Sequence, residues 1–347
     1  MNQTGKPLVS VIITTYKNEA LLPRAIGSVL SQTYPEIELI VVDDNAPDSP
    51  SRRATEAVME RFPSVRYLRH PENRNGAAAR NTGIRAACGK YLAFLDNDDM
   101  YFSGHIARCT EALEAEPDCV GALCGVVKIS SGLCWEAIPA VDGDIARKLM
   151  FSETALGTGS NLFARADAVR EIGGFDESFL RHQDVEFGLR LFAGRRACSL
   201  NTVDIVKEMD GFSNVPDFDR FRDTKRQLWK KFDAEIQRLD SGDRKRYFAG
   251  QYSALLYAAC KGGLRENILW TKKQLKSCRA LSTKEQIILA MTSVGMFPAY
   301  EAFKLAVKRR SAAALYRRVT EGLEPRDRSL LDSALTGCAE GGNACAE

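Results

Sequence analysis

Three carboxylates crowd one short stretch of this sequence. The run KYLAFLDNDDM, residues 90–100, places Asp96, Asp98 and Asp99 directly behind a series of apolar residues. Carboxylates this close repel one another and raise each other's pKa unless a cation is shared between them. The stretch therefore predicts a buried strand that ends at a site for a positive charge.

Acidic residues also stand beside two further apolar segments. Asp43 and Asp44 end the run IELIVVDD, and Asp184 opens the segment DVEFGLRLF. The apolar residues after Asp184 recur at helical spacing, so we expect this aspartate at the start of a helix. A turn cap for Asp43 and Asp44, and a helix N-cap for Asp184, are the alternatives without chemistry.

Strand-like and helix-like segments alternate through the first hundred residues. Strands are expected at about residues 8–16, 37–44, 65–70 and 90–99, and helices at 19–32, 53–62 and 76–88. This alternation predicts an α/β fold with a mostly parallel, wound sheet. Ligands of such sheets bind beyond the carboxyl ends of the strands, which is where the acidic residues fall.

Composition and charge suggest two parts. The 347 residues are 45% hydrophobic and 27% charged, as in a compact globular protein. Residues 1–215 carry a net charge of −6 and residues 216–347 one of +9. We therefore expect a catalytic domain over residues 1–215, a basic and mainly helical region over 216–335, and a disordered tail over 336–347.

Location and redox state follow from what the sequence lacks. The start MNQTGKPLVSVIITTY shows no secretory signal, and no apolar run is long enough to span a bilayer, so we expect a cytoplasmic protein. The ten cysteines are scattered without a C-x-x-C pair, which predicts reduced thiols and no zinc site.

Five motifs, in order, resemble the family 2 glycosyltransferases with the GT-A fold. They are VSVIITTYKNE, LSQTYPEIELIVVDDNA, NGAAARNTGIRAACGKYLAFLDNDD, IGGFDESF and QDVEFGLRL, and they cover about residues 7–195. The resemblance implies a nucleotide-diphospho-sugar transferase-like GT-A sheet flanked by helices. The chain after about Val215 lies outside it.

The resemblance assigns several residues to the sugar donor. Thr14, Tyr16 and Asp44 would contact the nucleotide, with the Tyr16 ring against the base and the Asp44 carboxylate accepting from a base N–H. Arg80 and Asn81 would face the donor, where Arg80 could brace the aspartates or a phosphate. A core tyrosine and an ordinary surface arginine are the alternatives.

The DND run matches the D-x-D pattern of the family, which implies Mn²⁺ or Mg²⁺ on the donor diphosphate. Asp98 would be a direct metal ligand and Asp96 a ligand through water or a contact to the ribose, with Asn97 also on the donor side. Asp99 could instead cap the next helix. A purely structural acidic turn is the alternative.

The acceptor side rests on the same resemblance. Asp184 corresponds to the general base, while Gln183 and Asp176 would lie near the acceptor. Gln183 stands where the common pattern has glutamate. Many relatives carry a metal-binding histidine about 25 residues after the base, but Met209 stands near that place here, with Lys207 and Asp210 as neighbouring candidates for the diphosphate and the metal.

Together these features predict an inverting transfer from a nucleotide-sugar, with UDP favoured, to a saccharide or lipid-linked acceptor in cell-surface polysaccharide or lipopolysaccharide assembly. The basic C-terminal helices, among them residues 300–319, suit peripheral contact with the inner face of the cytoplasmic membrane, or else pack onto the catalytic domain. A weak nucleotide-sugar binder and a nucleotidyltransferase are the alternatives. No nucleic-acid recognition motif is present, so no such partner is expected.

Overall fold

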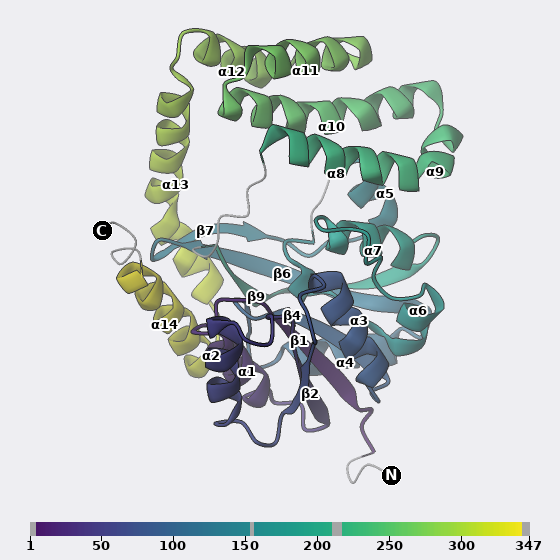
Figure 1. Cartoon of the computed structure of the whole chain (residues 1–347), viewed down its shortest axis with the longest axis vertical. Helices are drawn as coiled ribbons and strands as arrows, with labels where there is room; N and C mark the ends of the chain where they lie inside the picture. The colour runs from purple at the N-terminus through teal and green to yellow at the C-terminus, as the bar shows by residue number, and fades with distance from the viewer. Residues whose placement is uncertain (1–4, 153–155, 210–216, 342–347) are drawn as a thin grey trace. The chain divides into compact units, whose positions relative to one another are not determined.

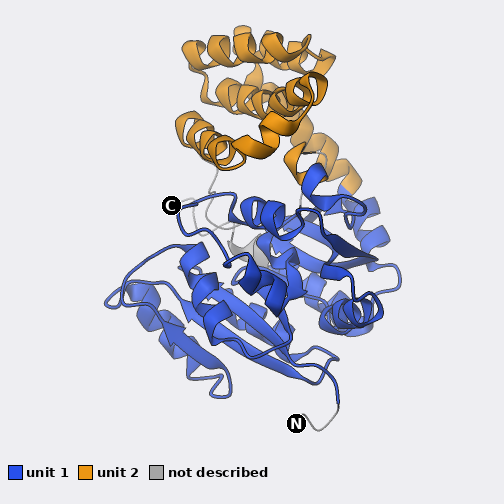
Figure 2. Cartoon of the chain, turned by 90° about the vertical axis from the view of Figure 1, so that its right-hand side faces the viewer, with its two compact units in different colours: residues 1–147, 155–212, 312–347 blue, residues 148–154, 213–311 orange. Residues whose placement is uncertain are grey.

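The computed structural model describes residues 5–152, 156–209 and 217–341. The chain forms two compact units (Figure 2). The first contains residues 1–147, 155–212 and 312–347, and the second contains residues 148–154 and 213–311. We call them the sheet unit and the helical unit.

The amino-terminal half of the sheet is parallel. The strands β1 (Val9–Thr15), β2 (Ile37–Asp43), β3 (Arg66–Arg69) and β4 (Tyr91–Asp96) lie in the order β3-β2-β1-β4 (Figure 1). Thr14 of β1 pairs with Val42 of β2 and with Asp96 of β4, so the three strands end at one edge. The predicted wound arrangement of alternating strands and helices is confirmed.

The other half of the sheet is mixed. The order continues as β4-β8-β6-β9-β5, with β7 paired to β6, and the described residues contribute nine strands to this sheet. The additional strands are β5 (Met100–Tyr101), β6 (Cys119–Ser130), β7 (Leu133–Ile138), β8 (Phe163–Arg165) and β9 (Arg196–Glu208). β6 and β9 run parallel, whereas β8 is antiparallel to both β4 and β6. This mixed half brings residues from beyond Thr158 next to the end of β4.

Helices cover both faces of the parallel strands. Val9, Val11 and Ile13 share a buried cluster with residues of α1 (Leu22–Leu30), α2 (Pro50–Met59) and α4 (His105–Ala115). On the other face, α3 (Gly76–Ala86) packs so closely that a Cβ on Gly83 would lie 2.3 Å from Ile12 Cγ2. The small residues of α3 thus let its backbone approach the sheet.

The shorter helices of the sheet unit carry or adjoin the motifs predicted for the acceptor side. They are the 3₁₀ helix η1 (Gly159–Asn161), α6 (Ala166–Glu171) and α7 (Gln183–Leu191). The Phe187 ring of α7 stacks on Phe175 at 4.1 Å and meets Phe94 of β4 edge-on at 6.0 Å. These contacts hold α7 against the α3 side of the sheet.

The chain returns to the sheet unit after residue 311. Val319, Leu331 and Ala334 share a buried cluster with Val206 of β9 and Phe102. They belong to the end of α13 (Phe297–Thr320) and to α14 (Pro325–Gly341). Residues 336–341 are therefore helical, and residues 342–347 of the predicted disordered tail lie outside the described residues.

The first segment of the helical unit starts at Lys148, within α5 (Ile145–Met150). The unit contains α8 (Phe218–Lys231), α9 (Asp233–Arg238), α10 (Ser241–Gly262), α11 (Arg265–Cys278), α12 (Thr283–Ser293) and the first part of α13. Its core joins Leu256 and Cys260 of α10 to Leu275 of α11, Ile288 of α12 and Phe297 of α13. Among the described residues, we find no helix that is both long and apolar enough to cross a membrane.

Candidate active site

The acidic stretch forms a compact cluster at the carboxyl end of β4. Asp96 is the last residue of β4, and Asp98 and Asp99 lie in the turn that leads to β5. One carboxylate oxygen from each aspartate lies within 4.8 Å of those of the other two. Such a set of oxygen donors could hold a divalent cation.

Asp99 is the most constrained member of the cluster. Its Oδ2 accepts hydrogen bonds of 2.6 Å from Thr158 Oγ1 and 2.6 Å from Ser160 Oγ. Its Oδ1 is buried without a hydrogen-bond partner in the described residues, and Lys207 Nζ lies 3.7 Å away. A buried carboxylate oxygen left in this way fits a hard cation such as Mn²⁺ or Mg²⁺.

Two side-chain cations already face the cluster. The Arg80 guanidinium on α3 donates to Asp96 Oδ1 at 2.5 Å, and only 12% of the side chain is exposed. Lys207 on β9 forms the ion pair with Asp99. Arg80 thus approaches the cluster from α3, and Lys207 approaches it from β9 in the mixed half of the sheet. The predicted contact of Arg80 with a donor stays a prediction.

Burial and charge set the protonation of the three aspartates. Burial, followed by the charges of Asp99 and Asp96, raises the pKa of Asp98 to about 7. Burial also raises the pKa of Asp99. For Asp96 burial acts in the same direction, but the charges of Arg80 and Lys207 outweigh it and lower the pKa. The cluster thus contains one firmly ionised carboxylate and one that titrates near neutral pH.

The charges of the three aspartates also shift the pKa of Lys207. Burial lowers the pKa of an ammonium group, but the charges of Asp99, Asp96 and Asp98 outweigh burial and raise the pKa of Lys207 above its ordinary value. Lys207 is consequently a permanent cation at this site.

Asp184 occupies the first turn of α7, as its sequence context predicts. Its pKa is raised by burial and by the charge of Asp96, against the opposing charges of Arg80 and Lys207. Next to it, Gln183 Oε1 accepts a hydrogen bond of 2.8 Å from Arg80. Arg80 therefore bridges the end of β4 and the start of α7, and it joins the acidic cluster and Asp184 in one site.

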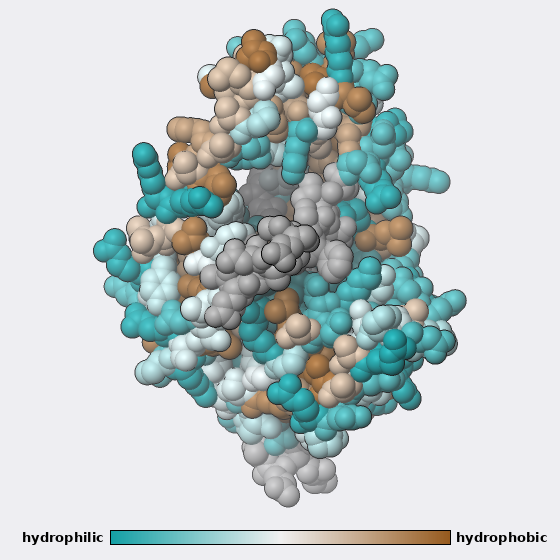
Figure 3. Space-filling view, turned by 60° about the vertical axis from the view of Figure 1, so that its left-hand side comes forward, coloured by the Kyte–Doolittle hydropathy of each residue, from teal (hydrophilic) through white to brown (hydrophobic). Residues whose placement is uncertain are grey.

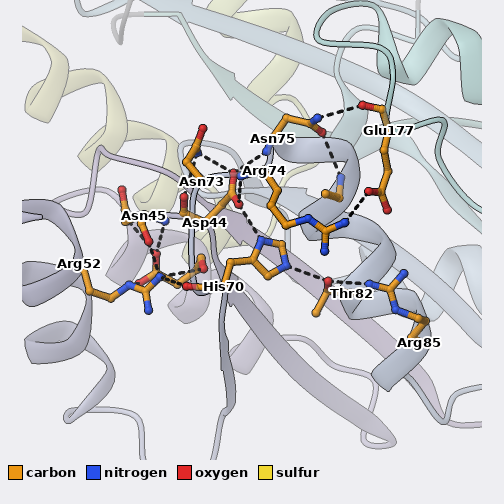
Figure 4. Close-up of polar contacts among 12 residues, drawn as sticks. Asp44, Asn45, Arg52, His70, Asn73, Arg74, Asn75, Thr82, Arg85 and Glu177 are labelled. Atoms are coloured by element: carbon orange, nitrogen blue, oxygen red, sulfur yellow. Dashed lines mark hydrogen bonds and ion pairs between the residues drawn. The ribbon is translucent and has the colours of Figure 1, made fainter. Parts of the chain in front are cut away.

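The Asp44 carboxylate is the centre of a separate hydrogen-bond network (Figure 4). It accepts hydrogen bonds from the backbone N–H groups of Arg74 and Asn75, both at 2.9 Å. It also accepts from Asn73 Nδ2 at 2.8 Å and lies 2.7 Å from His70 Nδ1. These contacts fix the turn that precedes α3. Recognition of a nucleotide base by Asp44 stays a prediction and would compete with them.

The other donor-side residues lie around the end of β1. Thr14 is on β1 itself, and the Tyr16 side chain just beyond it is 48% exposed. The Asn97 side chain donates to Thr15 Oγ1 at 3.0 Å and to the Lys17 carbonyl at 2.8 Å. Asn97 thus ties the acidic turn to the β1 loop, and Tyr16 is the residue with a surface open to a ligand.

Asp176 follows the turn after α6, and Asn81 on α3 contacts the same turn. Asn81 Nδ2 donates to the Phe175 carbonyl at 2.8 Å, and Asn81 Oδ1 accepts from Phe175 N at 2.8 Å. Asp176 Oδ1 accepts from the backbone of Ser178 at 2.9 Å. Asn81 therefore positions the acceptor-side turn. Its predicted donor contact stays a prediction, as does the acceptor contact of Asp176.

Thr158 and Ser160 were not singled out by sequence reasoning, and Lys207 only as a neighbour of the expected histidine. The run GTGSN does carry a signal, because two hydroxyl residues that alternate with two glycines suit a tight turn that donates to a carboxylate. Met209, which stands near the expected histidine, is 47% exposed. Asp210, the other candidate there, lies outside the described residues.

A second potential ligand set lies in the core of the sheet unit. His105, Cys124 and Asp204 are each 1% exposed, and their ligand atoms lie within 4.8 Å of one another. However, Arg108 donates to both carboxylate oxygens of Asp204, at 2.6 and 3.0 Å. Although burial opposes it, His105 and Arg108 lower the pKa of Asp204 to about 2. The negative charge of Asp204 is thus balanced by protein side chains, so we assign His105, Cys124 and Asp204 a structural role.

The predicted fold class is confirmed, because the chain forms a GT-A-like mixed sheet with flanking helices and a helical C-terminal region. Residues 10–173 match the family described as Glycosyl transferase family 2. The resemblance to the family 2 glycosyltransferases, predicted from the five motifs, is thus confirmed over this part of the chain.

Individual relatives resemble limited parts of the chain. The uncharacterized glycosyltransferase EpsJ of Bacillus subtilis (strain 168) is 41% identical over 126 residues, or 36% of each chain. The UDP-Glc:alpha-D-GlcNAc-diphosphoundecaprenol beta-1,3-glucosyltransferase WfgD of Escherichia coli is 35% identical over 28% of this chain and 38% of its own. The chain thus spans little more than a third of the length of these relatives.

Among solved structures, the chain is similar to the mannosyltransferase PcManGT from Pyrobaculum calidifontis in complex with GDP-Man and Mn²⁺. The TM-score is 0.48 and the identity 19%, over 99% of this chain and 89% of that one.

Proposed function

We propose that this chain transfers a sugar from a nucleotide-diphosphate sugar to a hydroxyl group of a saccharide or lipid-linked acceptor, with inversion at the anomeric carbon. The observation that carries the proposal is one site with two kinds of carboxylate. The Asp96, Asp98 and Asp99 cluster lies against Lys207, and Asp184 stands apart from it on α7.

Asp98 and Asp96 would hold Mn²⁺ or Mg²⁺. Asp99 Oδ1, which has no hydrogen-bond partner among the described residues and faces Lys207 at 3.7 Å, would lie beside them. When bound, such a cation would stabilise the negative charge that develops on the departing diphosphate. Arg80 and Lys207 would add two fixed positive charges on the same side. They would orient the phosphates and keep the carboxylates from repelling the donor.

Asp184 would act as the general base. The acceptor oxygen would form a bond to the anomeric carbon while the bond from that carbon to the phosphate oxygen breaks and the nucleoside diphosphate leaves. The acceptor proton would pass to the Asp184 carboxylate. Burial raises the pKa of Asp184, and a less acidic carboxyl group is a better proton acceptor.

UDP is the favoured nucleotide, which the name of the E. coli relative supports. That relative also acts on a lipid diphosphate, which supports a lipid-linked acceptor and a place in cell-surface polysaccharide or lipopolysaccharide assembly. A panel of UDP-, GDP- and dTDP-sugars, assayed for nucleoside diphosphate release with and without Mn²⁺, tests donor and metal together. A nucleotidyltransferase would instead release pyrophosphate from a nucleoside triphosphate.

Two matched variants separate the roles of the carboxylates. Asp98→Asn should abolish both turnover and Mn²⁺-dependent binding of the nucleoside diphosphate, measured by calorimetry. Asp184→Asn should lower turnover by about 10²–10⁴-fold and leave that binding unchanged. Asp118→Asn, an exposed carboxylate, is the control for loss of charge alone. Equal effects of the first two variants on binding would refute this division of roles, and binding without turnover for any acceptor would favour the weak nucleotide-sugar binder.

A further inference from the structure

Exposed hydrophobic side chains concentrate in one part of the helical unit. Of the eleven large hydrophobic residues that are exposed in the described chain, seven lie between residues 264 and 307. They occur on α11, α12, the turn after α12, and α13. We call these residues the apolar edge: Leu264, Leu269, Ile287, Val294, Met296, Phe303 and Val307.

The local structure explains why these side chains remain outside. On α13, Phe297 is buried in the core of the helical unit, whereas Phe303 is 67% and Val307 49% exposed. Residues four apart share one face of a helix, so Phe303 and Val307 lie side by side. Hydrophobic surface, brown in Figure 3, lies among hydrophilic side chains on this part of the molecule. The apolar edge is thus a consequence of the fold of the helical unit.

The turn between α12 and α13 presents two further apolar residues. Met296 N donates to the Met291 carbonyl at 2.8 Å, and Gly295 N donates to that of Thr292 at 3.1 Å. This is the double hydrogen bond of a Schellman motif, and Gly295 supplies the positive φ of 72° that it requires. The motif fixes the turn with Val294 66% and Met296 50% exposed.

The segment that carries the apolar edge is strongly basic. Residues 261–311 contain eleven Lys and Arg against three Asp and Glu, a net charge of +8. Two of the three acids are engaged internally, because Glu285 pairs with Arg279 at 2.7 Å and Glu301 with Lys304 at 3.2 Å. No charged residue occurs from Gln286 to Tyr300. The uncharged residues 286–300, which include Ile287, Val294 and Met296 of the apolar edge, therefore lie between two basic segments of the sequence.

We propose that the apolar edge inserts into the interface of an anionic phospholipid bilayer, with the surrounding Lys and Arg side chains at the headgroups. Apolar side chains bordered by positive charge favour this environment, because burial of the apolar groups and attraction to anionic lipids act together. A basic protein partner would be repelled by the same charge. The inference deepens the proposed use of a lipid-linked acceptor, since it places the chain at the surface where such acceptors reside.

The proposed surface shares only the first part of the segment expected to meet the membrane, residues 300–319. Tyr316 packs in the sheet unit and donates its hydroxyl to Asp332 at 2.6 Å, so the second half of α13 is committed to other contacts. The structure assigns the lipid contact to α11, α12 and the first half of α13 instead.

Co-sedimentation of the full chain with vesicles tests the proposal. Phosphatidylcholine vesicles with phosphatidylglycerol should bind the protein, and vesicles of phosphatidylcholine alone should not. The triple variant Val294→Ser, Phe303→Ser, Val307→Ser should lose about tenfold or more of this binding. The matched control, Leu30→Ser with Leu180→Ser, also removes exposed apolar side chains but should bind like the wild type. Equal binding of both variants, or no binding of the wild type to either vesicle, would overturn the proposal.

A second set of variants tests the charge. Lys308→Gln, Arg309→Gln and Arg310→Gln together should weaken vesicle binding and make it less sensitive to salt. The competing occupant is a second copy of the chain, and light scattering tests it. A dimer that dissociates in the triple serine variant would show that the apolar edge is a protein interface and would overturn the proposal. Nucleoside diphosphate release from a soluble donor should be unchanged in all these variants, so failure of vesicle binding and failure of the proposed transfer are distinguishable.

Discussion

At the scale of single residues, Asp98 connects the site to pH. Burial and the charges of Asp99 and Asp96 raise its pKa to about 7, well above that of an aspartate in the unfolded chain. The folded protein then binds more protons than the unfolded one between about pH 4 and pH 7. The metal-free protein should therefore lose stability as pH rises through this window, by roughly 2–4 kcal/mol.

This pH dependence has a specific check. Melting curves of the metal-free protein from about pH 4.5 to about pH 8.5 should show a Tm that falls up to about pH 7, and the fall should be smaller in Asp98→Asn. Addition of Mn²⁺ should stabilise the wild type more at the alkaline end, because the ionised carboxylate is the form that binds a cation. An unchanged slope in Asp98→Asn would mean that another group titrates.

Lys207 offers a second test at the same scale. Its ammonium group faces Asp99 from 3.7 Å, and replacement by methionine would leave the acidic cluster with Arg80 as its nearest described cation. Lys207→Met should destabilise the metal-free protein by about 2–3 kcal/mol, less than for a fully buried pair because the Lys207 side chain is 23% exposed.

Mn²⁺ should restore most of the stability lost in Lys207→Met, measured as the difference in Tm with and without the ion. The control is Lys128→Met on β6, whose ion pair with the half-exposed Glu136 is 3.3 Å long and contributes little. Similar effects of the two variants would show that Lys207 acts as an ordinary surface lysine.

At the scale of elements, the double glycine after α6 shows how backbone geometry positions the acceptor side. Gly173 and Gly174 have φ values of 76° and 72°. A Cβ on Gly174 would lie 2.5 Å from Asn81 Oδ1, whereas one on Gly173 would meet open space. Asn81 cannot easily move, because the same oxygen accepts from Phe175 N.

Replacement of each glycine by alanine separates strain from contact. Gly173→Ala should cost about 1 kcal/mol, the penalty of a positive φ alone. Gly174→Ala should cost about 2–3 kcal/mol, because displacement of Asn81 adds to it. Urea unfolding of the two variants measures the difference. If they were equally destabilised, the bonds between Asn81 and Phe175 would not hold this turn.

The same scale shows what the sequence could and could not predict. Apolar runs and helical spacing placed β1, β2, β4, α1 and α2, because each of these elements buries apolar side chains. The D-x-D run and Asp184 were visible as charges at the ends of apolar segments. The link from Thr158 and Ser160 to Asp99 was not, because it depends on β8 lying antiparallel between β4 and β6. Such long-range order has no local signal.

At the scale of the whole molecule, the division of the chain differs from the charge-based one. The net charge changes sign near residue 216, but α14 and the end of α13 pack in the sheet unit. Charge alone could not reveal this return, because apolar residues of α13 and α14 make the contact. The sheet unit is thus built from three separated segments of the chain, and its stability depends on its last segment.

One buried carboxylate ties that last segment to the sheet. Asp327 in the first turn of α14 accepts from Ser103 N and Ser103 Oγ, each at 2.8 Å, and is 6% exposed. Asp327→Ala would leave a buried N–H without its acceptor and should cost about 2–3 kcal/mol. Asp332→Ala, on the same helix but exposed and bonded to the Tyr316 hydroxyl, should cost about 0.5 kcal/mol.

Urea unfolding compares these two variants, and hydrogen exchange locates the effect. Faster exchange should appear in α14 of Asp327→Ala and in the parts of β6 and β9 whose residues Val127, Ile129 and Val206 share its apolar cluster. Exchange confined to α14 would mean that this helix lies on a sheet that is stable without it. Spread of the effect into β9, which carries Lys207, would show that the last segment of the chain supports the charge that faces the acidic cluster.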